Sequence, residues 1–260
     1  MQLSLLEKNK EKTKMSFLLK GIHYTYANGL RRLMMNYTPT MAIETVEFRK
    51  NSSSLYDEMV AHRLGLLALK TDLKGYKMAE TPEEVESAKC SVKLSLKAKG
   101  PCTVYASEIK SKDPEIVPVF LKTPIVKLLK GQELEFEALA ILGIGVDHVK
   151  WCPGLIFYSY EPTVTVNNNS SKFDEVKDKY PPQIFDKKGK IDKSLINTQT
   201  LIDACVGVCD DVVKVEYNQE NFIFTIESFG QLSCKETMLK ALDVFNEKLD
   251  NLQKEMVKIE

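Results

Sequence analysis

Apolar residues recur along the C-terminal end of the chain at alternating steps of four and three positions. They are Met238, Leu242, Phe245, Leu249, Leu252 and Met256. This is the spacing of the a and d positions of a heptad repeat, and it predicts a helix over residues 234–260 with one apolar seam. Because a single helix cannot bury such a seam against itself, the seam must pack on a sheet of this chain, on another of its helices, or on a partner protein.

A second amphipathic helix is predicted near the N-terminus, over residues 23–36. Its apolar face follows the spacing of helical turns and consists of Tyr26, Leu30, Leu33, Met34 and Tyr37. Pro39 ends the pattern. Gly29 weakens a helix at its centre, so its presence predicts close approach by another element. Arg31 and Arg32 lie off the apolar face, for which ordinary core packing is the simplest interpretation.

Residues 51–72, with the sequence NSSSLYDEMVAHRLGLLALKTD, join a short helix to a strand-like end. Ser54 is expected to cap this helix, whose first turn carries two acidic residues that suit the helix dipole. The predicted apolar side consists of Leu55, Met59, Leu66 and Leu67. Tyr56, His62 and Arg63 also belong to the segment, but without the partners that catalysis would require. The segment therefore predicts a contact surface.

Alternation of apolar and polar residues predicts strands in the middle of the chain. Between residues 90 and 105, Val92, Leu94 and Leu96 share one parity and polar residues share the other, as in a half-buried strand. Residues 133–141 form another strand-like run, and prolines divide the stretch between the two. A small, mainly β unit is therefore expected within residues 49–162.

A new unit is predicted to begin after residue 162. Residues 167–171 read NNNSS and precede a charged stretch and two prolines, which favours a linker or boundary. Residues 212–217 and 222–227 are both rich in strand-forming residues. They predict a hairpin with a turn at residues 218–221, in which Phe222, Phe224 and Ile226 share one face.

Composition excludes several classes of function. The 260-residue chain has 36 basic and 36 acidic residues, so no global field attracts nucleic acid, and direct nucleic-acid binding is not expected as its main role. No apolar run approaches the roughly 18 residues that span a bilayer, and the N-terminus is too charged for a signal peptide. We expect a cytoplasmic protein without membrane contact, in which the six cysteines are reduced thiols.

Cys205 and Cys209 have the C-x3-C spacing that closes a bacterial-type ferredoxin motif. The two earlier ligand positions of that motif would be residues 202 and 199, which are Ile202 and Gln199. Two thiolates cannot hold a cubane cluster, and the other cysteines are distant in sequence. No metal or cofactor is therefore expected, although an iron–sulfur, ferredoxin-like redox protein or sensor remains the alternative function.

Other candidate chemistry is incomplete. The three histidines are isolated from one another and from any C-x2-C pair, which argues against zinc. His148 and Cys152 have the composition of a base and a nucleophile but lack an orienting third group. Gly143 and Gly145 do not complete a phosphate-binding motif.

Three ordered blocks resemble a known family. They are residues 27–39 (ANGLRRLMMNYTP), residues 51–72, and residues 146–153 (VDHVKWCP). Together they resemble the family of the archaeal DNA-directed RNA polymerase D subunit, which is related to bacterial alpha and to the third-largest-type eukaryotic subunits. The resemblance implies an α+β fold with an alpha-subunit-like dimerisation domain formed by residues 1–48 and 213–260. A mainly β insert domain (residues 49–162) and a degenerate ferredoxin-like domain (residues 163–212) would interrupt it.

The resemblance also implies a function in assembly. Such a chain would be a non-catalytic platform within a nucleotidyltransferase complex, paired with the small L subunit, joined by the small N and P subunits, and docked to the large catalytic subunits. The implied interface with the L subunit consists of Tyr26, Leu30, Leu33, Tyr37, Leu242, Phe245, Leu249 and Leu252. Candidates for large-subunit contacts are Arg31, Arg32, His62 and Arg63. Some family members carry an iron–sulfur cluster, and this chain departs from their pattern at Gln199 and Ile202.

Overall fold

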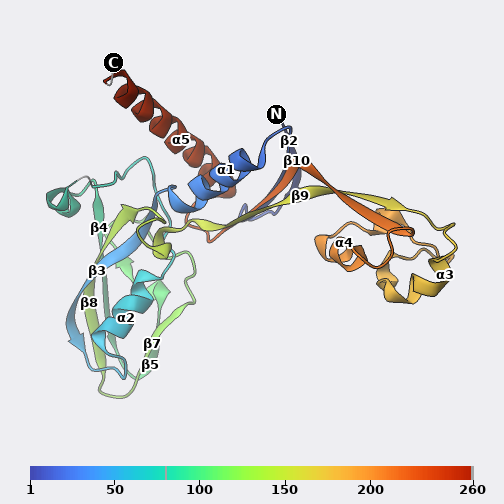
Figure 1. Ribbon diagram of the computed structural model, residues 1–260. Coiled ribbons are helices and arrows are strands. Elements are labelled where there is room, and N and C mark those ends of the chain that lie inside the picture. Colours follow the sequence, from blue (N-terminus) through green and yellow to red (C-terminus); the bar gives the residue numbers. More distant parts are fainter. Residues whose placement is uncertain (80, 259–260) are drawn as a thin grey trace. The chain divides into compact units, whose positions relative to one another are not determined.

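The computed structural model describes residues 1–79 and 81–258 and has the predicted mixture of helices and sheets (Figure 1). The strands are β1 (Gln2–Lys8), β2 (Lys14–Lys20), β3 (Thr40–Asn51), β4 (Ser91–Lys99), β5 (Cys102–Tyr105), β6 (Lys110–Ser111), β7 (Pro124–Leu128), β8 (Glu133–Gly143), β9 (Gly154–Val166) and β10 (Val213–Ser228). The α-helices are α1 (Tyr24–Asn36), α2 (Asp57–Gly65), α3 (Phe173–Val176), α4 (Gln199–Cys205) and α5 (Cys234–Val257). The chain divides into two compact units, and β1, β2, β9 and β10 contribute residues to both.

The larger unit is built on an antiparallel sheet of order β3-β8-β4-β6. Along β8, alternate residues such as Leu134 and Phe136 are buried, as the period of a strand requires. Val92, Leu94 and Leu96 of β4 are buried in the same core, which confirms the strand prediction. The sequence places the boundary between the dimerisation domain and the insert domain after residue 48, and strand β3 runs continuously across that point.

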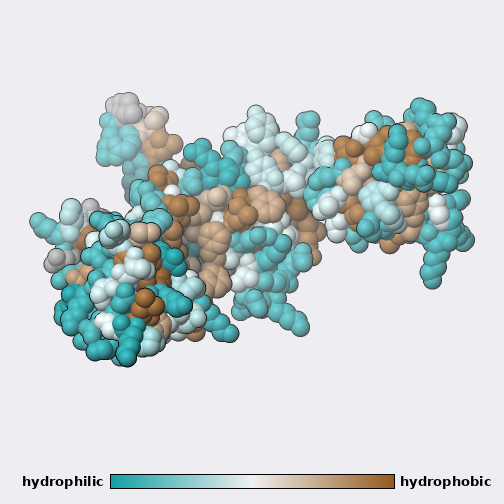
Figure 2. Space-filling view, turned by 90° about the horizontal axis from the view of Figure 1, so that it is seen from below, coloured by the Kyte–Doolittle hydropathy of each residue, from teal (hydrophilic) through white to brown (hydrophobic). Residues whose placement is uncertain are grey.

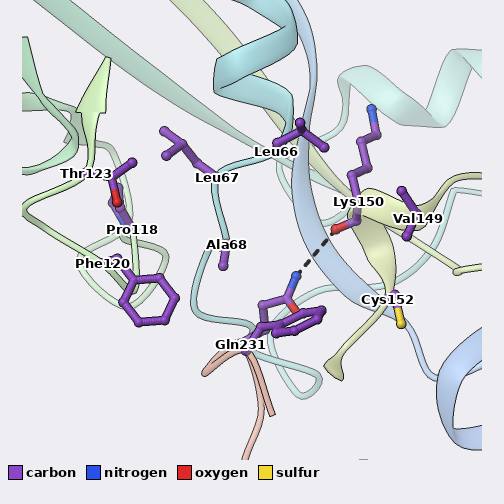
Figure 3. A pocket seen from close by; sticks show the side chains of 11 residues that line it. Leu66, Leu67, Ala68, Pro118, Phe120, Thr123, Val149, Lys150, Cys152 and Gln231 are labelled. Atoms are coloured by element: carbon purple, nitrogen blue, oxygen red, sulfur yellow. Dashed lines mark hydrogen bonds between the residues drawn. The ribbon is translucent and has the colours of Figure 1, made fainter. Parts of the chain in front are cut away.

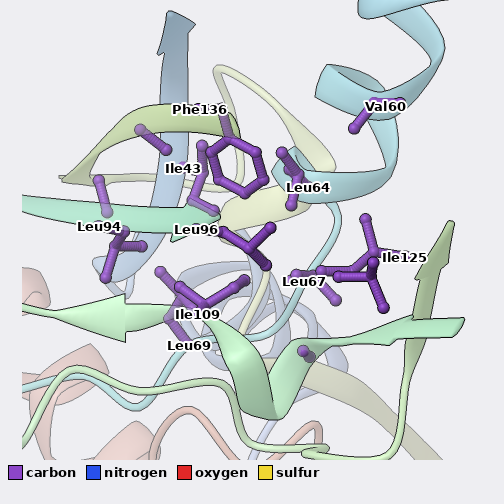
Figure 4. Close-up of a cluster of buried hydrophobic side chains, with 14 of the residues drawn as sticks. Ile43, Val60, Leu64, Leu67, Leu69, Leu94, Leu96, Ile109, Ile125 and Phe136 are labelled. Carbon is purple, nitrogen blue, oxygen red and sulfur yellow. The ribbon is translucent and has the colours of Figure 1, made fainter. Parts of the chain in front are cut away.

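Helix α2 packs on this sheet and completes the core of the larger unit (Figure 4). Its apolar side differs from the prediction, because Val60 and Leu64 are fully buried whereas Met59 and Leu66 are about half exposed. The helix begins at Asp57, after Tyr56, and no side chain caps it. The prediction that Ser54 is the cap is therefore wrong.

The error at Leu66 has a simple physical cause. The predicted helical period extends over residues 55–67, but α2 spans only Asp57–Gly65. Leu66 and Leu67 lie in the chain that leaves the helix, where orientation follows the path of the backbone and no longer a turn of 3.6 residues. Leu67 is buried there and Leu66 is not.

The hairpin predicted around residues 218–221 is also wrong, because β10 is one continuous strand across them. It lies between β2 and β9 in a sheet of order β1-β2-β10-β9. The backbone N–H of Ile22 donates to the Glu220 carbonyl at 3.0 Å, and the Asn221 side chain donates to Glu161 at 2.6 Å. The polar groups of Glu220 and Asn221 are thus hydrogen-bonded to neighbouring segments of the chain, and the backbone stays extended without a turn.

Residues 163–212, predicted to begin with a linker, belong to a folded part of the smaller unit. Tyr180, Ile184 and Cys205 are among the residues of its own hydrophobic core. Asn168 lies within the segment predicted to be a linker, and its side-chain amide makes two hydrogen bonds of 2.9 Å to the backbone of Ile191. The asparagine run therefore fixes a loop in place.

The structure confirms the helix predicted from the heptad spacing over Cys234–Val257, with Lys258 at its C-cap, and residues 259–260 of the prediction lie outside the described residues. Ser233 accepts a hydrogen bond from the Glu236 backbone, while the Glu236 carboxylate accepts from the Ser233 backbone at 2.9 Å. This reciprocal capping box fixes where the helix begins.

Candidate subunit interface

The apolar seam of α5 passes from burial to exposure along the helix. Cys234, Thr237 and Ala241 are buried in the larger unit, and the first seam residues are half-buried. Beyond them Leu249, Leu252 and Met256 are 47%, 60% and 57% exposed. In Figure 1 no other described element of the larger unit lies along the last turns of the helix. Packing within the larger unit therefore accounts only for the first half of the seam.

The C-terminal part of α1 lies beside α5. The ammonium group of Lys248 on α5 lies 4.1 Å from the ring centroid of Tyr37, which directly follows α1. A cation over an aromatic face contributes about 0.5–1 kcal/mol at an exposed site. The structure thus brings together two amphipathic segments from opposite ends of the chain.

The face of α1 is close to the predicted one but not identical. Ala27, Leu30 and Met34 are buried, whereas Tyr26 is 36% exposed. The prediction that Gly29 marks a close approach is wrong, because no described atom lies within 4 Å of the position that a Cβ would occupy there.

The four candidate polar contacts differ in their availability. The Arg31 guanidinium donates to the Asn28 side chain at 3.0 Å and is therefore held on its own helix. Arg63 donates to the Pro124 carbonyl at 2.7 Å and links α2 to β7. Arg32, His62 and Arg63 are all exposed. Of these three, Arg32 and His62 make no side-chain hydrogen bond to another described residue, so their side chains are the more available for a contact with another protein.

Exposed apolar side chains elsewhere do not define an interface by themselves. On the face shown in Figure 2, hydrophobic residues gather in separate groups within a mostly hydrophilic surface. Scattered apolar residues are normal on soluble proteins. The α5 seam is distinguished by its continuous heptad spacing, which a second helix or strand could follow.

Cys205 and Cys209 lie on and just after α4, within the smaller unit. Cys205 is fully buried and Cys209 is partly buried. Ile202, at a position where the ferredoxin motif has a ligand, is part of the hydrophobic core. Gln199 donates to the Asp203 carboxylate at 2.7 Å. Within residues 1–79 and 81–258 no group of three or more metal-ligating side chains is assembled.

The structure does not assemble the candidate pair of His148 and Cys152. The imidazole Nδ1 of His148 accepts from the Lys150 backbone at 3.1 Å. The Cys152 thiol donates to the Gly154 carbonyl at 3.2 Å, and burial raises its pKa, so it stays protonated near neutral pH. Gly143 packs against the Trp151 indole, where a Cβ would overlap the ring. Packing and backbone hydrogen bonds therefore explain the residues around His148 and Cys152.

Comparison with known proteins agrees with this geometry. Residues 42–153 match the family model described as the RNA polymerase Rpb3/RpoA insert domain. DNA-directed RNA polymerase subunit Rpo3 of Pyrococcus furiosus is 34% identical over 99% of this chain and 98% of its own length. The Rpo3 subunit of Methanosarcina acetivorans is 35% identical over 97% of both chains. This chain belongs to the archaeal Rpo3 family.

Membership of the Rpo3 family confirms the family resemblance drawn from the three sequence blocks and the alpha-subunit-like α+β fold. The Rpo3 subunit of Methanothermobacter thermautotrophicus, 34% identical over 94% of this chain and 96% of its own, gives the same result. The residues matched to the insert-domain model include β4, β8 and α2, which build the core of the larger unit. No helix among the described residues is long and apolar enough to cross a membrane.

Proposed function

We propose that this chain is a non-catalytic assembly subunit of DNA-directed RNA polymerase that forms a heterodimer with the small L subunit through α5 and the end of α1. The single observation that carries the proposal is the exposed second half of the α5 seam. A heptad seam that remains in water on a folded chain has the form of an interface awaiting a partner.

The seam is suited to supply binding energy. Full burial of a leucine or methionine side chain contributes about 1.5–3 kcal/mol. Leu249, Leu252 and Met256 each leave roughly half of their surface exposed, and a partner can bury that half. Tyr37 and Lys248 lie at the side of this surface, where they extend it with an aromatic ring and an aliphatic stem. The arrangement has an apolar centre and a polar edge, as protein interfaces do.

The heterodimer would then dock the large catalytic subunits, with the small N and P subunits joining the complex. Arg32 and His62 are our candidates for the polar contacts to a large subunit, because both are exposed. Arg31 and Arg63 have the weaker claim, since their guanidinium groups already donate within the chain.

We also infer that the chain carries no iron–sulfur cluster. The inference is supported by Gln199 and Ile202 at two ligand positions and by the burial of Ile202 in the core. The test is the visible absorption spectrum of protein purified without oxygen. A featureless spectrum agrees with the inference, whereas a cluster band that disappears in Cys205→Ser would overturn it in favour of the redox function.

The interface test uses the double variant Leu249→Asp/Leu252→Asp, co-expressed with the L subunit. The matched control is Leu239→Asp. Leu239 is 51% exposed on the same helix but is not a seam residue, because it is turned by about 100° from Met238 and by about 60° from Leu242. We expect the double variant to lose the heterodimer and the control to keep it, both with unchanged circular dichroism. Heterodimer formation by the folded double variant would contradict the proposal.

A further inference from the structure

A pocket of about 330 Å³ lies in the larger unit (Figure 3), and its lining residue Gln231 stands shortly before Cys234, the first residue of α5. Its lining comes from the chain that follows α2, the loop before β7, the turn before β9 and the chain that follows β10. Four large apolar side chains of this lining are 45–68% exposed, namely Leu66, Phe120, Val149 and Phe229. The pocket is therefore an apolar hollow with an apolar rim.

Backbone hydrogen bonds hold the walls of the pocket together. The Val119 N–H donates to the Ala68 carbonyl at 2.8 Å, and the Thr71 N–H donates to the Gln231 carbonyl at 3.0 Å. The Phe229 N–H donates to the Pro153 carbonyl at 3.1 Å. Segments distant in sequence are thus fixed against one another, as in a preformed binding site.

Gln231 at one side of this pocket is the unusual residue. It is only 5% exposed, and its Nε2 donates to the Lys150 carbonyl at 3.4 Å, as the dashed line in Figure 3 shows. Because that carbonyl can only accept, the amide nitrogen must face it, and this fixes the orientation of Oε1. Oε1 is buried and accepts no hydrogen bond from any residue that the structure describes. Leaving a buried acceptor unpaired is costly, so Oε1 would gain from a donor once the Gln231 side chain turns toward the pocket.

The chemistry of the lining restricts which donor can satisfy it. No acidic side chain is among the described lining residues, and the ammonium group of Lys150 already pairs with Glu44. A cationic guest would be buried without a counter-charge, so the guest is neutral. The volume equals that of about eleven waters, at ~30 Å³ each, which suits one large side chain. Tryptophan and tyrosine combine an apolar body with a neutral N–H or O–H and are typical anchors of protein interfaces.

We propose that this pocket receives one aromatic side chain with a neutral donor, a tryptophan or tyrosine, from another polymerase subunit, and that the donor bonds to Gln231. The proposal rests on the assembly function proposed above. Cys234 is the first residue of α5, and Leu252 of the exposed seam lies 18 residues further along the helix, a distance of about 27 Å. The guest therefore comes from a protein segment other than the one that covers the exposed seam.

The first test uses small probes on the full chain and needs no other subunit. Indole mimics a tryptophan side chain, and 1-methylindole has the same rings without the N–H. We expect NMR titration to show indole binding at the pocket, with 1-methylindole weaker by roughly 2- to 12-fold, the value of one hydrogen bond. In Gln231→Leu the two probes should bind equally. Equal binding to the natural chain, or no binding of indole, overturns the proposal.

The second test asks whether a subunit uses the pocket. Ala68→Phe fills it from within, and Ala88→Phe places the same ring on an exposed loop of the same unit as a control. In tagged chains purified from cells, we expect Ala68→Phe to keep the small subunit but to lose large subunits, and Ala88→Phe to keep both. If Ala68→Phe fails to fold, Val149→Glu on the 68% exposed rim takes its place with the same expectation.

The outcomes separate this proposal from the assembly function. Full assembly by the folded Ala68→Phe or Val149→Glu variant overturns the pocket proposal and leaves the assembly function standing. If no polymerase subunit co-purifies with the natural chain, the assembly function and the pocket proposal are both overturned, because the proposed guest of the pocket belongs to such a subunit.

Discussion

The burial of residues at the end of α2 gives a sharp test of the core, because two leucines two residues apart have opposite environments. Leu64 is fully buried among the residues of the larger unit's core, whereas Leu66 is 51% exposed. Leu64→Ala should leave a cavity and cost about 2–5 kcal/mol. Leu66→Ala removes a side chain with half its surface in water. Its cost should be about 1 kcal/mol, half the transfer energy of a fully buried leucine.

The chain offers a natural probe for this measurement. Trp151 is its only tryptophan and is buried in the same unit as α2, so its fluorescence reports on that unit. Urea unfolding of the two variants should give equal m-values and different midpoints. A loss of ~3 kcal/mol corresponds to a fall in melting temperature of about 6–12 °C. Equal destabilisation by the two variants, or a larger effect at Leu66, would refute this description of the core.

Three further predictions concern single groups. The Tyr76 hydroxyl donates to Asp113 at 2.7 Å, which lowers the pKa of Asp113 and, with burial as the larger cause, raises the pKa of Tyr76 to about 12. The ionised Asp113 therefore stabilises the fold above its unfolded pKa, and this stability is lost as pH falls through the lower folded pKa. The difference in unfolding free energy between the natural chain and Tyr76→Phe should be present at neutral pH and shrink in acid, and a difference independent of pH would contradict the assignment. Iodoacetamide should label exposed Cys102 before buried Cys152, because the raised pKa of Cys152 keeps it a thiol. Mass spectrometry of the digested protein gives the order of labelling, and the reverse order would be incompatible with this structure. Ser233→Ala should cost about 1 kcal/mol of unfolding free energy by removing the cap of α5, measured by urea unfolding, and an unchanged midpoint would show that the cap is dispensable.

The parts of the fold that the sequence predicts correctly are those with a long, unbroken period. The heptad spacing from Met238 to Met256 predicts α5, and the alternation around Leu94 predicts β4. Each pattern repeats over many residues, so a single residue cannot shift the register. The Ser233 capping box, which the spacing alone does not reveal, fixes the beginning of α5.

The wrong predictions arise where the environment overrides a local preference. Residues 218–221 have the composition of a turn, but hydrogen bonds from neighbouring chain at Glu220 and Asn221 keep β10 extended. In α2 the helix is too short for its flanks to share its period, so the period places Leu66 on the wrong side. Both errors concern polar or terminal positions, where tertiary contacts decide the conformation.

The candidate interface is partly visible in the sequence and the pocket is not. The seam residues follow from spacing, but only the fold separates the covered half, near Ala241, from the exposed half, near Leu252. Gln231 carries no local signal. Its unpaired Oε1 results from the meeting of segments that lie far apart in sequence.

The central claim, that the chain works as an assembly subunit of RNA polymerase, is tested most directly by what accompanies it in the cell. The measurement is purification of the full chain, tagged and at natural abundance, under native conditions, followed by mass spectrometry of the complex. We predict a polymerase-sized complex that contains the large catalytic subunits and the small partner on α5. Recovery of the chain alone, or only with redox proteins, would contradict the claim.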